Sequence, residues 1–156
     1  MAAKLADDEL LITRTFDAPP KLVFELWSDP DHLKRWMGPE GFDCPVAEVD
    51  FRVGGRYRGL IRSPEHGDNW FSGVYREIQP HTRLVFTFTW KNTGPSAEIE
   101  TLITITLADL NGKTAMTFHQ TPFSSVAARD RHVGGWTSSF EKTNTYLTQL
   151  MKERAA

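Results

Sequence analysis

The sequence predicts an α+β fold, in which a curved antiparallel sheet of about seven strands packs against one long C-terminal helix. One strand pattern comes first, two short helical patterns follow it, and a β pattern then continues for about eighty residues. The longest helical pattern closes the chain. Because the turns between the later strands are short, neighbouring strands are expected to pair in antiparallel order.

The first strand is expected at residues 9–18, where apolar and polar side chains alternate. The sequence then changes to a helical period. Pro19 and Pro20 can open a helix, because proline is tolerated in the first turn. Asp29 before Pro30 fits an N-cap followed by proline at the first helical position. Two short helices are therefore predicted, at about 20–27 and about 30–36.

Further strand patterns follow, separated by turns rich in glycine, proline, asparagine and aspartate. They cover residues 42–51, 56–62, 69–78, 83–90, 98–107 and 113–121. Alternation gives these strands one apolar face. In the strand at 83–90, for example, Leu84, Phe86 and Phe88 share a face that Thr87 does not. One side of the sheet is therefore expected to be apolar and the other hydrated.

The last helical pattern begins after Ser124 or Ser125, either of which could cap it, and at about 28 residues it would reach about 40 Å. Its expected apolar stripe contains Val133, Trp136, Phe140, Leu147, Leu150 and Met151. Gly134 and Gly135 lie inside this helix. Because glycine costs about 1 kcal/mol relative to alanine in a helix, the pair indicates close packing or a bend.

Three segments of the chain resemble one known family when they are taken together. They are LKRWMGP at 33–39, DFRVGGRYR at 50–58 and GGWTSSFEKTNTYL at 134–147. With the order of elements given above, they resemble the activator of heat-shock protein 90 ATPase homologue-like family, a branch of the START-like (SRPBCC) superfamily. The resemblance runs from about residue 12 to about residue 150. It implies the helix-grip fold, in which the curved sheet wraps around the long helix.

Length and composition fit a single domain of this kind. The chain has 156 residues, 40% of them hydrophobic and 24% charged, which is ordinary for a globular domain. Residues 1–156 are expected to form one START-like domain, with a core at about 10–152 and a flexible lead at 1–9.

Charge and cysteine content exclude several classes of protein. The formal net charge of −2 offers no general attraction to nucleic acid, and no apolar run is long enough for a membrane span. Cys44 is the only cysteine, so no intrachain disulfide can form. Because the sequence also lacks a signal-peptide pattern, the protein is expected in the cytoplasm.

Motif searches give no catalytic signature. No nucleophile elbow, zinc-protease, phosphate-loop or dinucleotide-binding motif occurs. The five histidines have no metal-ligand spacing, so neither a metal nor another cofactor is expected. The neighbours of Cys44, Asp43 and Pro45, do not suggest a reactive thiolate, and the cysteine is expected to pack. The sequence therefore favours a protein without catalysis.

Aromatic and polar side chains on the inward faces are the remaining candidates for a functional site. They either pack the core or line a cavity between the sheet and the last helix, above all where Gly59, Gly73 and Gly135 replace larger side chains. The cavity-lining candidates are Trp36, Met37, Tyr57, Phe71, Tyr75, Phe86, Phe88, Trp90, Met116, Phe118, Gln120, His132, Trp136 and Phe140.

The end of the second short helix is expected to lie at the rim of that cavity. Residues 33–42 carry large apolar side chains at the point where glycine and proline stop the helix. Trp36 and Met37 are expected at the rim, with Trp136 of the last helix as the opposite wall. The same residues are also suited to plug the core.

The resemblance implies three functions between which the residues do not decide. The first is binding of a small hydrophobic or amphipathic molecule, since START-like folds commonly enclose lipids, polyketides or plant hormones. The second is a cyclase or aromatase that uses the same cavity, with Tyr57, Gln120 and His132 as acid, base or orienting groups. The third is activation of a chaperone ATPase in the stress response. Exposed strand edges also make a homodimer plausible.

Overall fold

The structure, a computed structural model, describes residues 6–91 and 100–155. Residues 1–5 of the lead that was predicted to be flexible, and the start of the strand predicted at 98–107, lie outside the described residues. The elements are β1 (Leu10–Phe16), α1 (Pro20–Ser28), α2 (Pro30–Trp36), β2 (Asp43–Val49), β3 (Arg56–Ser63), β4 (Gly67–Gln79), β5 (Arg83–Trp90), β6 (Thr101–Leu110), β7 (Lys113–Thr121) and α3 (Val126–Ala155).

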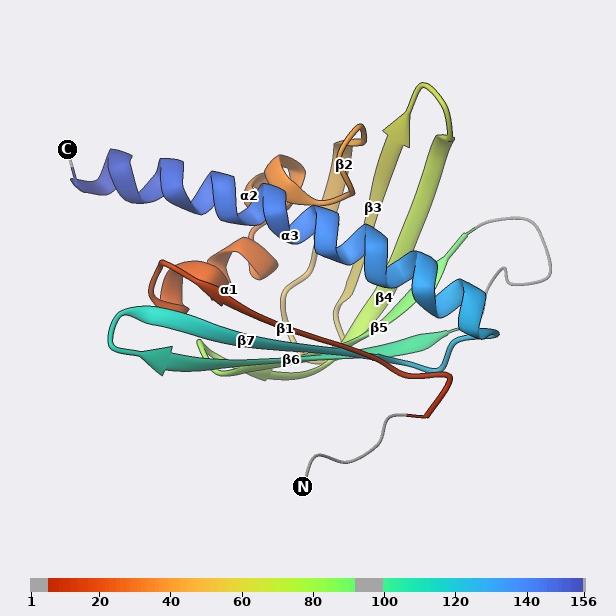
Figure 1. Cartoon of the computed structure of the whole chain (residues 1–156), viewed down its shortest axis with the longest axis horizontal. Helices are drawn as coiled ribbons and strands as arrows, with labels where there is room; N and C mark the ends of the chain where they lie inside the picture. Colours follow the sequence, from red (N-terminus) through yellow and green to blue (C-terminus); the bar gives the residue numbers. More distant parts are fainter. Residues whose placement is uncertain (1–5, 92–99, 156) are drawn as a thin grey trace.

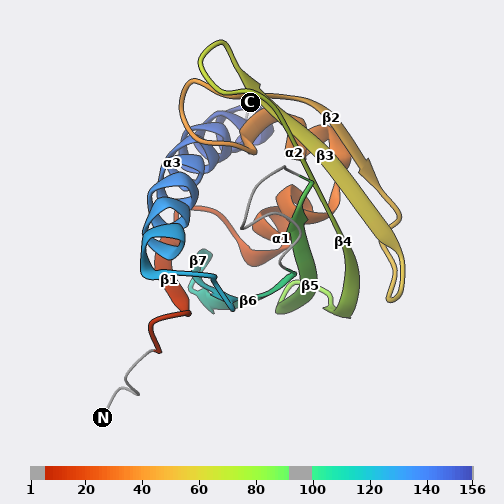
Figure 2. The same ribbon diagram turned by 90° about the vertical axis from the view of Figure 1, so that its right-hand side faces the viewer.

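The strands form one seven-stranded antiparallel sheet in the order β1-β7-β6-β5-β4-β3-β2. The sheet curves around α3, which crosses it along its length (Figure 1, Figure 2). Helix α1 packs on β6 and β7, and α2 packs on β2 and on α3. This arrangement confirms the predicted α+β helix-grip architecture. No helix in the described ranges is long and apolar enough to cross a membrane.

The helix boundaries have the local chemistry that the sequence predicted. Pro20 stands at the start of α1 and Pro30 at the start of α2, where proline has no intrahelical hydrogen bond to lose. The Asp29 carboxylate accepts a hydrogen bond from the Asp31 backbone N–H at 2.8 Å, so Asp29 caps α2. At the start of α3, the Ser125 hydroxyl accepts from the Ala128 backbone N–H at 3.0 Å.

The buried face of α3 is rotated relative to the predicted stripe. Val133 and Met151 were expected on it, but they are 36% and 38% exposed. Ser139 and Thr143 are buried instead, because each hydroxyl donates to the carbonyl four residues earlier, at 2.9 and 3.0 Å. Local bonds of this kind make a polar residue compatible with the core, and hydrophobic periodicity does not detect them.

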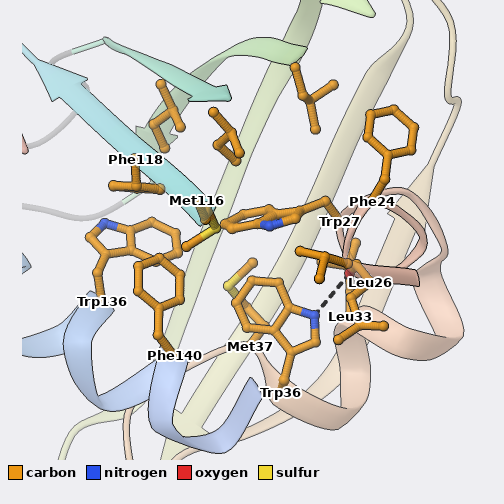
Figure 3. Close-up of a cluster of buried hydrophobic side chains, with 14 of the residues drawn as sticks. Phe24, Leu26, Trp27, Leu33, Trp36, Met37, Met116, Phe118, Trp136 and Phe140 are labelled. Carbon is orange, nitrogen blue, oxygen red and sulfur yellow. Dashed lines mark hydrogen bonds between the residues drawn. The ribbon is translucent and has the colours of Figure 1, made fainter. Parts of the chain in front are cut away.

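The centre of the core lies where α1, α2 and the middle of α3 meet (Figure 3). The Trp27 ring contacts those of Trp36, Phe118 and Phe140 at centroid distances of 4.7, 6.1 and 6.1 Å. Trp36 has no exposed surface, and its indole N–H donates to the Leu26 carbonyl at 2.9 Å. Trp36 therefore plugs the core and does not lie at a rim.

Two strand glycines that were expected to leave space are closely covered. A Cβ atom on Gly59 would lie 2.4 Å from the Phe71 ring. A Cβ atom on Gly73 would lie 1.9 Å from the Thr87 carbonyl oxygen and 2.7 Å from the Tyr57 ring. These glycines allow close approach of neighbouring strands and rings, and they leave no hollow at either position.

Candidate functional site

A cavity of about 650 Å³ lies between the N-terminal half of α3 and the sheet. The segment joining α2 to β2 closes one end of it, and strands β3, β4 and β5 provide the floor. Helix α2 packs on α3 and α1 packs on β6 and β7 (Figure 1), while the residues of α3 that line the cavity lie between Asp130 and Ser139.

The floor of the cavity is apolar and largely aromatic. Ile61, Phe71 and Phe88 line it, Trp136 of α3 lies beside Phe88, and each of the four is at most 6% exposed. The rings of Phe71 and Phe88 stack nearly parallel, 5.5 Å apart. Trp90 meets Phe88 edge to face at 5.1 Å. Binding of an apolar guest to such a surface would be favourable, because apolar area would be buried. An aromatic guest would also contact the faces and edges of these rings.

The wall formed by α3 has gaps where side chains would stand. Gly134 and Gly135 line the cavity, and a Cβ atom on either would meet no atom within 4 Å. Of the close packing or bend expected for this pair, close packing is therefore absent. Both glycines destabilise the helix relative to alanine, and packing does not require either of them. Their presence is explained if another molecule occupies the space in front of them.

Replacing Gly134 with alanine is expected to raise the free energy of unfolding by about 0.5–1 kcal/mol, because alanine is the better helix former and the site is open. Urea denaturation measures the change. Gly54→Ala is the matched control: its Cβ would also meet nothing, but its φ of +84° strains an L-residue, so that variant should lose stability. A destabilised Gly134→Ala protein would contradict the open wall.

The segment between α2 and β2 is fastened to α3 by two side chains. The Lys142 ammonium donates to the Gly38 and Phe42 carbonyls, at 3.1 Å each. The Ser138 hydroxyl accepts from the Glu40 backbone N–H at 2.8 Å. Burial lowers the pKa of Lys142. These bonds hold Met37 and Phe42 in place as cavity wall.

His132 joins α3 to the sheet beside the cavity. The Trp90 indole N–H donates to His132 Nε2 at 2.9 Å, so Nε2 is unprotonated. Nδ1 lies 2.7 Å from the Ala128 carbonyl and must donate to it. Both ring nitrogens of the neutral imidazole are thus engaged, and burial lowers the pKa of His132. In this arrangement His132 has no nitrogen left to act as a base.

Acid should weaken the fold through His132. Its pKa is lowered from 6.5 in the folded state, so the unfolded chain binds a proton more readily. Its contribution to the free energy of unfolding is therefore complete above pH 6.5 and falls as the pH decreases below that value. The stability lost between pH 7.5 and pH 5.5 should be smaller in a His132→Gln protein, as measured by denaturant titration at each pH. An unchanged pH dependence would contradict this assignment.

Polar and charged residues surround the mouth. His66, Asn69, Asp130 and Arg131 line it, and all except Asn69 are exposed. Asp130 pairs with Arg129, at 3.1 Å. The His66 ring stacks on Phe42 at 5.5 Å. A guest would thus meet polar groups at the mouth and aromatic rings at the floor.

The structure brings part of the predicted site together and places the rest elsewhere. The predicted residues that line the cavity are Met37, Phe71, Phe88, Trp90, His132 and Trp136. The others belong to the packed interior: Trp36, Tyr57, Tyr75, Phe86, Met116, Phe118, Gln120 and Phe140. Neighbouring side chains already occupy the space around this second group.

Sequence reasoning missed the residues of the mouth, most of the segment that connects α2 to β2 (residues 37–42, the connecting segment), and single residues of β3 and α3. These are Gly38, Pro39, Phe42, Ile61, His66, Asn69, Asp130, Arg131, Gly134 and Ser139. Ile61 had a usable signal, since it shares the inward register of β3 with Tyr57 and Gly59. The break in the helical pattern at 38–41 also marked the connecting segment. The mouth residues carried no such signal.

The polar groups proposed for catalysis are committed to structural hydrogen bonds. The Tyr57 hydroxyl donates to the Thr87 carbonyl at 2.6 Å, and burial raises its pKa well above the usual value. The Gln120 amide accepts from the Trp136 indole N–H and donates to the Thr101 hydroxyl, both at 2.9 Å. Neither group is placed to transfer a proton to a guest in the cavity.

Cys44 lies beside a second, more polar hollow of about 430 Å³ on the other side of the connecting segment. The thiol is buried and donates to the Val46 carbonyl at 3.3 Å. Burial raises its pKa to about 11, so it stays protonated at neutral pH, as a packing role requires. Within the described part of the chain, no cluster of His, Cys, Asp or Glu could hold a metal ion.

Comparison with known proteins gives a family and a fold. The family model described as Activator of Hsp90 ATPase homolog 1-like protein matches residues 17–148. A solved protein from Chromobacterium violaceum is 29% identical, with a TM-score of 0.81 over 90% of this chain and 97% of that one. The AHSA1 protein from Silicibacter pomeroyi is 24% identical, with a TM-score of 0.77 over 90% and 98%. None of the curated proteins compared with the chain matches it.

Proposed function

The chain belongs to the Activator of Hsp90 ATPase homolog 1-like family, and from that fold and its cavity we propose that it binds a small hydrophobic or amphipathic molecule. The ligand would lie between the aromatic floor and α3. Its affinity would come mainly from burial of apolar surface, at roughly 25 cal/mol per Å².

One observation supports this proposal above the others. The wall of the cavity contains two successive helical glycines at which an added Cβ atom would meet nothing within 4 Å. In a helix shaped only for stability, residues with side chains would stand at these two positions, because helical glycine costs free energy. The volume also lies within the range of about 300–1,000 Å³ that is typical of small-molecule sites.

The proposal can be tested by filling the cavity from α3. The uncharged dye N-phenyl-1-naphthylamine should bind the wild-type protein saturably, with a rise in fluorescence. Gly135→Leu places a side chain in the open space and should weaken binding at least about tenfold, without loss of stability, since leucine is the better helix former.

Thr137→Leu is the matched control for this experiment. It adds the same side chain to an exposed position of α3 that does not line the cavity, so dye binding should be unchanged. Equal binding by the wild-type and Gly135→Leu proteins would show that the dye binds elsewhere. Absence of saturable binding by the wild type would overturn the proposal.

Activation of a chaperone ATPase is the alternative that the family description supports. It requires a surface that contacts the chaperone, and it does not require the cavity. A pull-down with the chaperone, followed by an ATPase assay with and without this protein, separates the two functions. If Gly135→Leu abolishes dye binding but leaves ATPase stimulation intact, the stimulation does not depend on the cavity.

A cyclase or aromatase reaction in the same cavity has weaker support. Tyr57 and Gln120 lie in the packed interior, and both nitrogens of His132 are engaged. A single domain, a cytoplasmic location and a homodimer remain predictions from the sequence. Limited proteolysis, cell fractionation and light scattering would test them in turn.

A further inference from the structure

We propose that the ligand is an amphipathic anion, with a flat apolar body on the aromatic floor and a carboxylate or sulfonate group that meets Arg131 at the mouth of the cavity. This inference rests on the proposed function, because it specifies the chemistry of a molecule bound in the same cavity. It follows from two observations on the described residues. Arg131 carries a free positive charge at the mouth, and the residues deep in the cavity have no free hydrogen-bond donor for a ligand.

Arg131 is the uncommitted cation of the mouth. It lines the cavity, it is exposed, and among the described residues it has no ion-pair or hydrogen-bond partner. The neighbouring carboxylate of Asp130 is paired with Arg129 at 3.1 Å. Lys142, on the same helix, is held by the Gly38 and Phe42 carbonyls. Because the Asp130 carboxylate is paired with Arg129, Arg131 is the charged side chain of the described mouth residues that is free to pair with a guest.

The residues deep in the cavity, on the floor and on α3, cannot satisfy a polar group of the ligand. The indole N–H of Trp90 donates to His132, and that of Trp136 donates to Gln120. The Ser139 hydroxyl donates to the Gly135 carbonyl. A charged group buried against these residues would lose its hydration without gaining a donor, which is strongly unfavourable. The anion must therefore remain at the mouth, and only the apolar body can enter.

The shape of the floor favours a flat body. Phe71 and Phe88 present nearly parallel rings, and Trp136 meets Phe88 edge to face at 5.8 Å. Aromatic pairs of this geometry are more stable than their buried area alone predicts. A planar ring system can stack on such a surface, whereas a flexible chain loses more conformational entropy when it is bound there.

Two dyes with the same skeleton test the charge directly. 1-Anilinonaphthalene-8-sulfonate carries a sulfonate that N-phenyl-1-naphthylamine lacks. At low ionic strength the wild-type protein should bind the sulfonate at least about fivefold more tightly than the neutral dye, and added salt should reduce that ratio. Arg131→Gln should bring the ratio close to one, and Arg131→Glu should reverse it.

Arg56→Gln is the matched control, since it removes one positive charge from an exposed position of β3 that does not line the cavity. The ratio should be unchanged in that protein. Equal wild-type affinity for the two dyes, no effect of Arg131→Gln, or an equal effect of Arg56→Gln would overturn the anion inference. In those cases the proposed function stands, because the neutral dye still binds. If neither dye binds saturably, both proposals fail.

Discussion

Replacing Gly73 with alanine is expected to lower the free energy of unfolding by about 3 kcal/mol or more. The added Cβ would lie 1.9 Å from the Thr87 carbonyl oxygen, which is a backbone atom and cannot rotate away. Relief requires β4 and β5 to separate. That movement would weaken the hydrogen bonds of the Thr87 carbonyl with Tyr57 and of the Thr87 hydroxyl with Val74. Urea or thermal denaturation measures the loss.

The control for this experiment is the same substitution at Gly134, for which the expected change has the opposite sign. Both residues lack a side chain, but one is enclosed by backbone and the other faces open space. If the two variants lose similar amounts of stability, the loss reflects a general sensitivity to Gly→Ala, and the steric argument for Gly73 is wrong.

Replacing Gln120 with leucine is expected to cost about 2–3 kcal/mol. Gln120 is 1% exposed, and its amide links three strands to α3: it accepts from Trp136, it donates to Thr101, and Thr101 donates to the Phe88 carbonyl. Leucine would leave the Trp136 indole N–H buried without an acceptor. Denaturant titration measures the loss, and a change in Trp136 fluorescence should accompany it.

A double-mutant cycle separates the hydrogen bond from packing. Trp136→Phe should also destabilise, because the Gln120 carbonyl oxygen then lacks its donor. The Gln120→Leu and Trp136→Phe double variant should lose less than the sum of the single losses, since no buried partner is left unpaired. Thr117→Val, on the opposite face of β7, should change little. Strict additivity would mean that the two side chains do not interact.

The order of elements could be predicted because each one has a local cause. Proline and Asp29 mark the helix starts, and alternation sets the inward face of a strand, as the buried Ile103, Ile105 and Leu107 of β6 illustrate. In β5 the other face is not hydrated as predicted, because Val85 and Thr87 are buried too. The exposed fraction of Val133 could not be predicted. Its position on the helix is apolar by pattern, but the buried face turns toward Ser139 and Thr143, which satisfy their hydroxyls locally.

The cavity was only partly predictable, because alternation gives the face of a residue and not the layer above it. Phe86 and Phe88 share the inward face of β5, two residues apart. Phe86 lies against Trp27 of α1, while Phe88 lies against Trp136 and lines the cavity. Trp36 and Met37 differ in the same way: Trp36 fills the core, and Met37 lines the cavity. Only the tertiary arrangement distinguishes the members of each pair.

The two halves of α3 rest on different supports, and this has a consequence for how the protein can change over time. The half from Phe140 to Leu147 is anchored in the interior beside α1 and α2. The half around Gly134 spans the cavity: His132 and Trp136 bond it to the sheet, while a Cβ atom at Gly134 or Gly135 would meet nothing within 4 Å. With the proposed ligand in the cavity, substitutions at the two open glycines would alter which molecule is accepted, while the anchored half preserves the fold. In a scaffold divided in this way, mutations can change the chemistry of the cavity with little loss of stability.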